Sequence, residues 1–328
     1  MIGAEPPFPF ERRRDGFRLF IICNLWYNKA EHIRRGLLKE DDSMRELRIR
    51  TFPNNPTLRG LSRMERDIVF STGTGVELKL QLILPEVVET TPLFPLVVFV
   101  QGSAWTFPVA EHKLPQMGMF AQSDIAVAMV THRSCLDGYP APAFLQDVKT
   151  AIRFLRANAA RWHLDPERVG IWGTSSGGNT ALLCGLTGDD PAYETEEYAG
   201  FSDSVKAVAD CFGPTDLPGM ISVTENNADM QQIMQALLGT DPEEQLRRAR
   251  EISPLYRVEP GKDYPPFFLL HGDADTVVPY DQSVRMGERL LACGAQVSMI
   301  RVADAPHENS FWNPAVYDEI LGFFKRVL

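Results

Sequence analysis

The Gly-Thr-Ser-Ser-Gly stretch at 173–177 has the residue types and spacing that point most directly to chemistry. It follows the apolar run 169–172 and precedes residues 179–186, whose composition predicts a helix. The pattern also arises by chance, but its position between a strand and a helix favours a functional serine. In that setting the serine hydroxyl is lifted clear of the sheet. The helix amino end then faces the group that the serine attacks. Glycine is required on both sides because side chains there would collide with neighbouring elements. Ser175 is therefore the candidate nucleophile.

A serine nucleophile needs a general base, and the base needs a carboxylate that orients it. Around this kind of serine turn the three residues follow one another in the order Ser, Asp or Glu, His. Of the six histidines, only His271 and His307 come after Ser175. Both follow strand-like apolar runs, but His271 is better explained as a strand-end histidine bonded within its own loop. His307 is therefore the candidate base.

The candidate acid is chosen among the carboxylates near these two loops. Asp304 and Glu308 are close to His307 in the sequence, and a carboxylate on Asp304 would hardly reach Nδ1 while the ring faces the serine. Asp275 lies further into its loop than Asp273, which is typical of a turn former that caps local backbone amides. We therefore favour Asp275, with Asp273 as the alternative.

A second loop predicts an oxyanion hole. It follows the apolar run 95–100, which is typical of a central parallel strand, and it begins Gln-Gly-Ser-Ala-Trp. Small residues there let backbone N–H groups approach a developing oxyanion closely. The candidate donors are Ser103 or Ala104, joined by Ser176, and Trp105 is a candidate substrate-binding residue. A plain glycine-containing turn also explains this loop, but its pairing with the serine motif favours the oxyanion hole.

Together these motifs resemble the α/β-hydrolase superfamily. More narrowly, they are similar to acetyl xylan and feruloyl esterases of the bifunctional carbohydrate-esterase type and to hormone-sensitive-lipase-like esterases. The resemblance covers roughly residues 65–328 and implies an α/β fold with a mostly parallel central sheet, helices on both faces and a small helical cap. It also implies a Ser-His-Asp triad without cofactor or metal. Where relatives carry His-Gly-Gly, this chain has Gln101, Ser103 and Ala104, whose side chains narrow the loop. The resemblance is carried by Gln101–Trp105, Gly173–Gly178, His271–Asp275 and Pro306-His307.

The resemblance and the narrow loop predict a serine esterase for acetyl-like esters, with small-molecule or carbohydrate esters, feruloyl esters included, as substrates. One alternative is a serine peptidase of the prolyl-oligopeptidase type, which shares the serine turn and the His-Gly-x-x-Asp loop. That type carries a propeller domain built of repeats, and this sequence shows no internal repeat. A catalytically silent hydrolase-like receptor is another alternative, but such proteins usually lose a triad member and all three candidates are present here.

Composition limits the possible partners. The net charge of −10, without a basic stripe, argues against nucleic acid and anionic membrane surfaces. Five scattered cysteines predict reduced core residues rather than disulfides or a metal site. Basic residues before the apolar stretch 17–27 resemble a signal peptide, but polar residues interrupt that stretch, no cleavage site follows, and it is too short to span a bilayer. We therefore expect a cytoplasmic protein, whose oligomeric state the sequence leaves open.

The chain is predicted to hold an N-terminal accessory segment at 1–64 and one hydrolase domain at 65–328. Residues 214–264 are too many for a plain loop, which predicts a helical cap near the serine. Its methionines either line an adaptable pocket or pack on the body of the domain. The expected strands are an edge hairpin at 67–70 and 76–84, then parallel strands at about 96–100, 125–130, 169–172, 205–209, 267–270 and 297–302.

Overall fold

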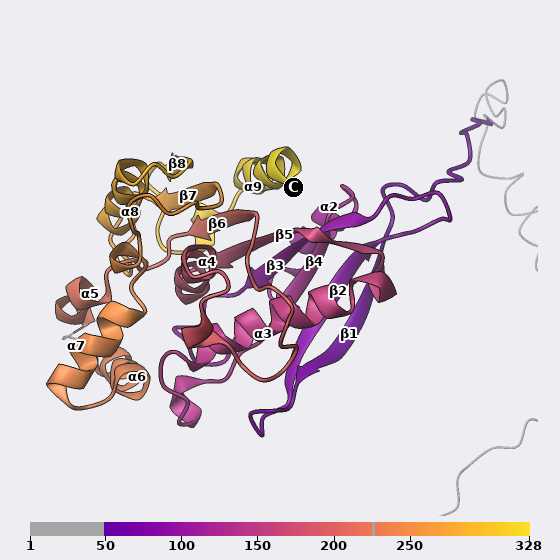
Figure 1. Ribbon diagram of the computed structural model, residues 1–328. Helices are drawn as coiled ribbons and strands as arrows, with labels where there is room; N and C mark the ends of the chain where they lie inside the picture. Colours follow the sequence, from indigo (N-terminus) through magenta and orange to yellow (C-terminus); the bar gives the residue numbers. More distant parts are fainter. Residues whose placement is uncertain (1–48, 225–226) are drawn as a thin grey trace, which may run out of the picture. The chain divides into compact units, whose positions relative to one another are not determined.

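The computed structural model describes residues 49–224 and 227–328, within which Asn55–Leu328 form one compact unit. Its centre is an eight-stranded sheet with the strand order β1-β2-β4-β3-β5-β6-β7-β8 (Figure 1). β2 is antiparallel to both β1 and β4, and all other neighbouring strands are parallel. The predicted fold class is thereby confirmed. The strands are β1 (Ser62–Ser71), β2 (Leu78–Pro85), β3 (Phe94–Val100), β4 (Ala126–Val130), β5 (Leu164–Thr174), β6 (Ala207–Cys211), β7 (Phe267–Gly272) and β8 (Val297–Val302).

Helices cover both faces of the sheet, as predicted. The apolar stripe of α3, including Phe144, Val148 and Ile152, is buried in a core cluster that also contains side chains of α4 and α8. α2 and α9 contribute to a second cluster on the other face. The helices are α2 (Leu114–Ala121), α3 (Ala143–Ala157), α4 (Ser176–Leu186), α5 (Leu217–Thr224), α6 (Ala228–Leu238), α7 (Pro242–Glu251), α8 (Asp281–Ala292) and α9 (Pro314–Val327), with 3-10 turns at Cys135–Asp137, Ala159–Trp162, Pro191–Tyr193, Pro254–Tyr256 and Asn309–Phe311.

The insertion between β6 and β7 holds α5, α6 and α7, in agreement with the predicted helical cap (Figure 1). Local chemistry explains where two of these helices begin. The side chain of Asn227 accepts a hydrogen bond from the Met230 N–H at 3.1 Å, and that of Asp241 accepts one from the Glu244 N–H at 3.0 Å. Both are N-caps that satisfy backbone donors of a first helical turn. α6 is tied to the chain before α3 because the Leu237 carbonyl accepts from the Ala141 N–H at 2.9 Å.

The observed strand bounds differ most from the expected ones at β1, β5 and β6. β5 begins at Leu164 rather than 169, because Leu164 pairs with Phe94 before the register shifts. β6 lies at Ala207–Cys211 rather than 205–209. β1 begins at Ser62 rather than at 67. Residues 1–48 of the predicted accessory segment, with the stretch 17–27, lie outside the described residues.

Two further sequence expectations concern cysteines and membranes. Cys135, Cys184, Cys211 and Cys293 are all unpaired, and Cys23 lies outside the described residues. Three of the four described cysteines are buried, as expected of core residues. Within the part of the chain that the structure describes, no helix has the length and apolar character needed to cross a membrane.

Candidate active site

Ser175 occupies the turn between β5 and α4 in a strained backbone conformation, with φ 52° and ψ −126°. Left-handed φ values are uncommon for residues other than glycine and occur at functional sites. The flanking glycines are needed for space: a Cβ on Gly173 would lie 1.9 Å from the Gly177 carbonyl oxygen, and one on Gly177 would lie 2.1 Å from that of Val100. The Ser175 N–H donates to the Cys211 carbonyl at 2.9 Å, which fixes the turn against β6.

The structure brings His307 and Asp275 to this serine. His307 Nε2 lies 3.0 Å from Ser175 Oγ, and His307 Nδ1 lies 2.7 Å from Asp275 Oδ2. A carboxylate only accepts, so Nδ1 carries the proton and Nε2 is free to accept from the serine hydroxyl. Asp275 Oδ1 in turn accepts from the N–H groups of Val277 at 2.8 Å and Val278 at 2.9 Å. This is the hydrogen-bond arrangement of a serine triad.

Asp275 is held in its ionised form. Burial alone would favour the neutral acid, but hydrogen bonds from His271 and His307 outweigh it and keep the pKa of the Asp275 carboxyl below its ordinary value. Asp273 does not reach His307. Its carboxylate accepts from the Asp304 N–H at 2.6 Å and lies 3.6 Å from the Arg301 guanidinium, so it stabilises the loop.

His271 forms bonds within its own loop, as expected, but it also contacts the acid, which sequence reasoning missed. It is fully buried, with Nε2 2.9 Å from the Val278 carbonyl oxygen and 3.2 Å from Asp275 Oδ2. Because a carbonyl only accepts, Nε2 carries the proton, and Nδ1 accepts from the Ser283 hydroxyl at 2.7 Å. The four-residue spacing in His-Gly-x-x-Asp is the sequence signal from which this contact could have been predicted.

The oxyanion loop corrects one of the predicted donors. The Ser103 N–H already donates to Ser176 Oγ at 2.9 Å, so it is not available to a substrate. Ala104, with φ 51°, has an N–H without an acceptor among the described residues. Ser176 is the first residue of α4, and its N–H has no carbonyl one turn earlier in the helix. The loop can pack this closely against the serine because residue 102 is a glycine. A Cβ on Gly102 would lie only 2.6 Å from Ser175 Cβ.

Residues 80–290, more than half of the chain, match the BD-FAE family. The chain belongs to the BD-FAE family. In sequence it is 30% identical over 222 residues to esterase LipC of Mycobacterium tuberculosis, which covers 65% of this chain and 52% of LipC. A truncated carbohydrate esterase from gut microbiota superposes with a TM-score of 0.69 at 27% identity, covering 83% of this chain and 98% of that one. A bifunctional GH43-CE protein of Bacteroides eggerthii gives 0.68 at 32% identity, covering 80% and 35%.

These likenesses confirm the predicted resemblance to esterases of the α/β-hydrolase type. This BD-FAE chain spans about half the length of the curated relatives that it matches, such as LipC at 52%.

The site opens into a small cavity of about 180 Å³. One wall is the oxyanion loop with Trp105, which is 4% exposed and packs against Phe144 with ring centroids 6.0 Å apart. Side chains of α5 and α6 also line the cavity, and the cap methionines Met220, Met230 and Met234 are among them. The lining residues are Ala104, Trp105, Ser175, Ser176, Pro214, Leu217, Met220, Asn227, Met230, Met234, Thr276, Val277 and Val278.

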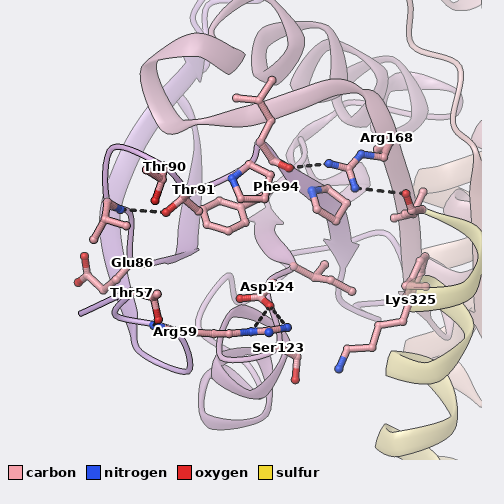
Figure 2. A pocket seen from close by; sticks show the side chains of 17 residues that line it. Thr57, Arg59, Glu86, Thr90, Thr91, Phe94, Ser123, Asp124, Arg168 and Lys325 are labelled. Atoms are coloured by element: carbon pink, nitrogen blue, oxygen red, sulfur yellow. Dashed lines mark hydrogen bonds and ion pairs between the residues drawn. The ribbon is translucent and has the colours of Figure 1, made fainter. Parts of the chain in front are cut away.

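A larger cavity of about 490 Å³ lies at the opposite edge of the sheet, where β3 and β4 begin (Figure 2). Its wall carries the Arg59–Asp124 ion pair, with 2.8 Å between the charged atoms, and Arg168 donates to the Leu93 carbonyl. It contains none of the triad residues, so the smaller cavity is the one that serves Ser175. Among the described residues, no group of three or more His, Cys, Asp or Glu side chains is arranged to hold a metal ion.

Proposed function

We propose that this BD-FAE member is a serine carboxylic-ester hydrolase in which Ser175 is the nucleophile, His307 the general base and Asp275 the residue that orients it. The observation that carries the proposal is the continuous hydrogen-bond chain: 3.0 Å from Ser175 Oγ to His307 Nε2, and 2.7 Å from His307 Nδ1 to Asp275. Membership of an esterase-type family supports it.

The reaction follows from this geometry. His307 Nε2 takes the proton of Ser175 while Oγ attacks the ester carbonyl carbon. The negative charge that develops on the carbonyl oxygen is stabilised by the backbone N–H groups of Ala104 and Ser176. Imidazolium gives its proton to the leaving alcohol, and the acyl group stays on the serine. Water, deprotonated by the same imidazole, attacks the acyl-enzyme, and Ser175 regains its proton as the acid leaves.

We also propose that the acyl group is short, acetyl-like in size. The cavity of about 180 Å³ is smaller than the roughly 300–1,000 Å³ typical of small-molecule pockets. Trp105 closes one side of it, and the cap helices close another. The rest of the ester must then lie outside, which suits a sugar or aromatic alcohol or a small-molecule ester. The carbohydrate esterases among the structural relatives support this substrate class. In this proposal residues 65–328 form the catalytic domain, and α5–α7 form its cap.

A series of p-nitrophenyl esters from acetate to laurate tests the proposal. We expect kcat/KM to be highest for acetate and to fall with length, since each methylene without room costs ~1–3 kcal/mol of transition-state binding. Ser175→Ala is the control and should lose on the order of 10⁴-fold or more in kcat. A maximum at octanoate or beyond refutes the short acyl site. Hydrolysis that survives in Ser175→Ala refutes the nucleophile. Assays on acetylated xylan and on methyl ferulate then compare an acetyl ester of a carbohydrate with a feruloyl ester of a small alcohol.

A further inference from the structure

The loop that carries His307 has an unusual backbone. Between β8 and α9, three of its residues, Asp304, Glu308 and Asn309, have φ values of 56°, 61° and 50°. Such conformations are strained for residues with side chains and persist only where surrounding contacts impose them. Glycine would adopt them without strain. A glutamate in this conformation directly after the proposed general base therefore requires an explanation in its side-chain contacts.

The Glu308 carboxylate joins two active-site loops. Its Oε2 lies 3.0 Å from Lys113 Nζ and accepts a hydrogen bond of 2.5 Å from the Trp312 indole. The Lys113 ammonium also lies 4.2 Å from the centre of the Trp312 ring. The Lys113 and Glu308 side chains are only 10% and 30% exposed, so water screens their attraction less than it screens a surface pair. Lys113 immediately precedes α2, at the far end of the loop that begins as the oxyanion segment.

The same carboxylate is coupled to the catalytic imidazole by packing. Phe212 meets the His307 ring edge to face, with centroids 4.6 Å apart, and it meets Trp312 at 5.9 Å. Trp312 stacks on Tyr317 at 5.0 Å, which fixes it to α9. Glu308 thus holds the Trp312 indole, which packs against Phe212. Phe212 is in turn the ring that contacts His307.

We propose that Glu308 is a positioning residue for the esterase reaction. Its carboxylate, clamped between Lys113 and Trp312, holds the loop at 303–313 in its strained course so that Nε2 of His307 meets the serine. Neither Glu308 nor Lys113 lines the substrate cavity. The inference rests on the proposed function, and it predicts an effect on turnover rather than on substrate binding.

Glu308→Gly tests this directly, because glycine keeps the backbone conformation without strain and removes only the side chain. We expect kcat on p-nitrophenyl acetate to fall ~10–100-fold, as slight misplacement of a catalytic group does, with KM within about twofold. The melting temperature should not fall in parallel, because backbone strain is relieved. Glu308→Gln and Lys113→Met should each lower kcat, and the double variant should lose no more than the worse single one, since both remove the same ion pair.

Asp124→Gly is the matched control. Asp124 also has a left-handed φ, of 66°, and an ion pair, with Arg59, but it lies at the opposite edge of the sheet (Figure 2). That variant should keep the wild-type kcat. A kcat of Glu308→Gly within about twofold of wild type overturns the proposal, as does a change confined to KM. Wild-type kcat in Glu308→Gln overturns it too, because the charge would then be dispensable.

Hydrogen exchange gives a readout that does not depend on catalysis. Amides of residues 303–313 should exchange faster in Glu308→Gly than in wild type, and not in Asp124→Gly. Unchanged exchange there refutes the positioning role. If the wild-type protein hydrolyses no ester, the proposed function fails, and the exchange experiment still decides whether Glu308 holds the loop.

Discussion

Asp275→Asn is the substitution that tests the proposed triad most sharply, because every group around this carboxylate is a donor. Oδ1 accepts from the N–H groups of Val277 and Val278, and Oδ2 faces the imidazole nitrogens of His307 and His271. An amide nitrogen in place of either oxygen therefore meets another N–H. The arrangement that relieves the conflict moves the His307 proton to Nε2 so that Nδ1 accepts from the amide. Nε2 then faces Ser175 with a proton and cannot act as a base.

The expected loss is ~10⁴-fold in kcat, the size seen when a triad histidine takes the wrong tautomer, and this corresponds to ~5.5 kcal/mol. The pH range follows from the sign of the pKa change. Because the pKa of Asp275 is depressed, the contribution of its ionised carboxylate is fully present above the ordinary aspartate range. That contribution is lost only as the pH falls through the lower pKa of the folded state. The loss should therefore be the same from about pH 6 to pH 9 in a p-nitrophenyl acetate assay.

Asp273→Asn is the matched control for this prediction. Its carboxylate accepts from a backbone N–H and faces Arg301 at 3.6 Å, and an amide oxygen can keep the first contact. We expect kcat within about tenfold of wild type. Equal losses in the two variants, or the greater loss in Asp273→Asn, would refute Asp275 as the orienting acid.

Two further predictions follow from the packing around the serine turn. Gly102→Ala places a Cβ 2.6 Å from Ser175 Cβ and 2.7 Å from the Thr174 carbonyl oxygen. It should destabilise the protein by ~1–3 kcal/mol in urea unfolding and lower kcat, and unaltered activity would contradict the close packing of the loop. Burial raises the pKa of the Asp210 carboxyl from 3.8 to about 7. Between these two pH values the folded state holds a proton that the unfolded chain has lost, so the free energy of unfolding falls as the pH rises. Asp210→Asn removes this effect, and its unfolding free energy relative to wild type should increase by ~4 kcal/mol from pH 4 to pH 8; a constant difference would refute the burial argument.

Much of the fold follows from local pattern in the sequence. The continuous apolar character of β3, and the helical spacing of Phe144, Val148 and Ile152 in α3, specify buried elements before any tertiary contact is known. Strand ends are less well determined. β5 extends back to Leu164 because a partner strand is available there, and its own composition does not reveal that pairing.

The site, like the fold, can be predicted only in part from the sequence. Asp275 can be preferred over Asp273 from its depth in the loop, and the geometry agrees with that preference. The sequence does not reveal that the Ser103 N–H is already occupied, because the acceptor is the Ser176 hydroxyl on a different element. The Lys113–Glu308 pair is similarly hidden, since its members follow different strands and meet only after the sheet has formed. Sequence spacing predicts which residues lie at the strand ends, but the direction in which each N–H group points depends on tertiary contacts.

Several residues with a left-handed φ lie around the site, although others, such as Asp124, lie away from it. Left-handed φ values occur at Ser175, Ala104, Trp105 and Glu308, which all lie on loops that follow the carboxyl ends of β5, β3 and β8. Each of these strands is paired in the sheet, so the point from which each loop departs is fixed. A rigid strand end lets the first residues of a loop be held in a costly conformation by a few contacts, which a mobile loop cannot do. The contacts that hold those conformations, such as the Glu308–Lys113 pair, should therefore control turnover.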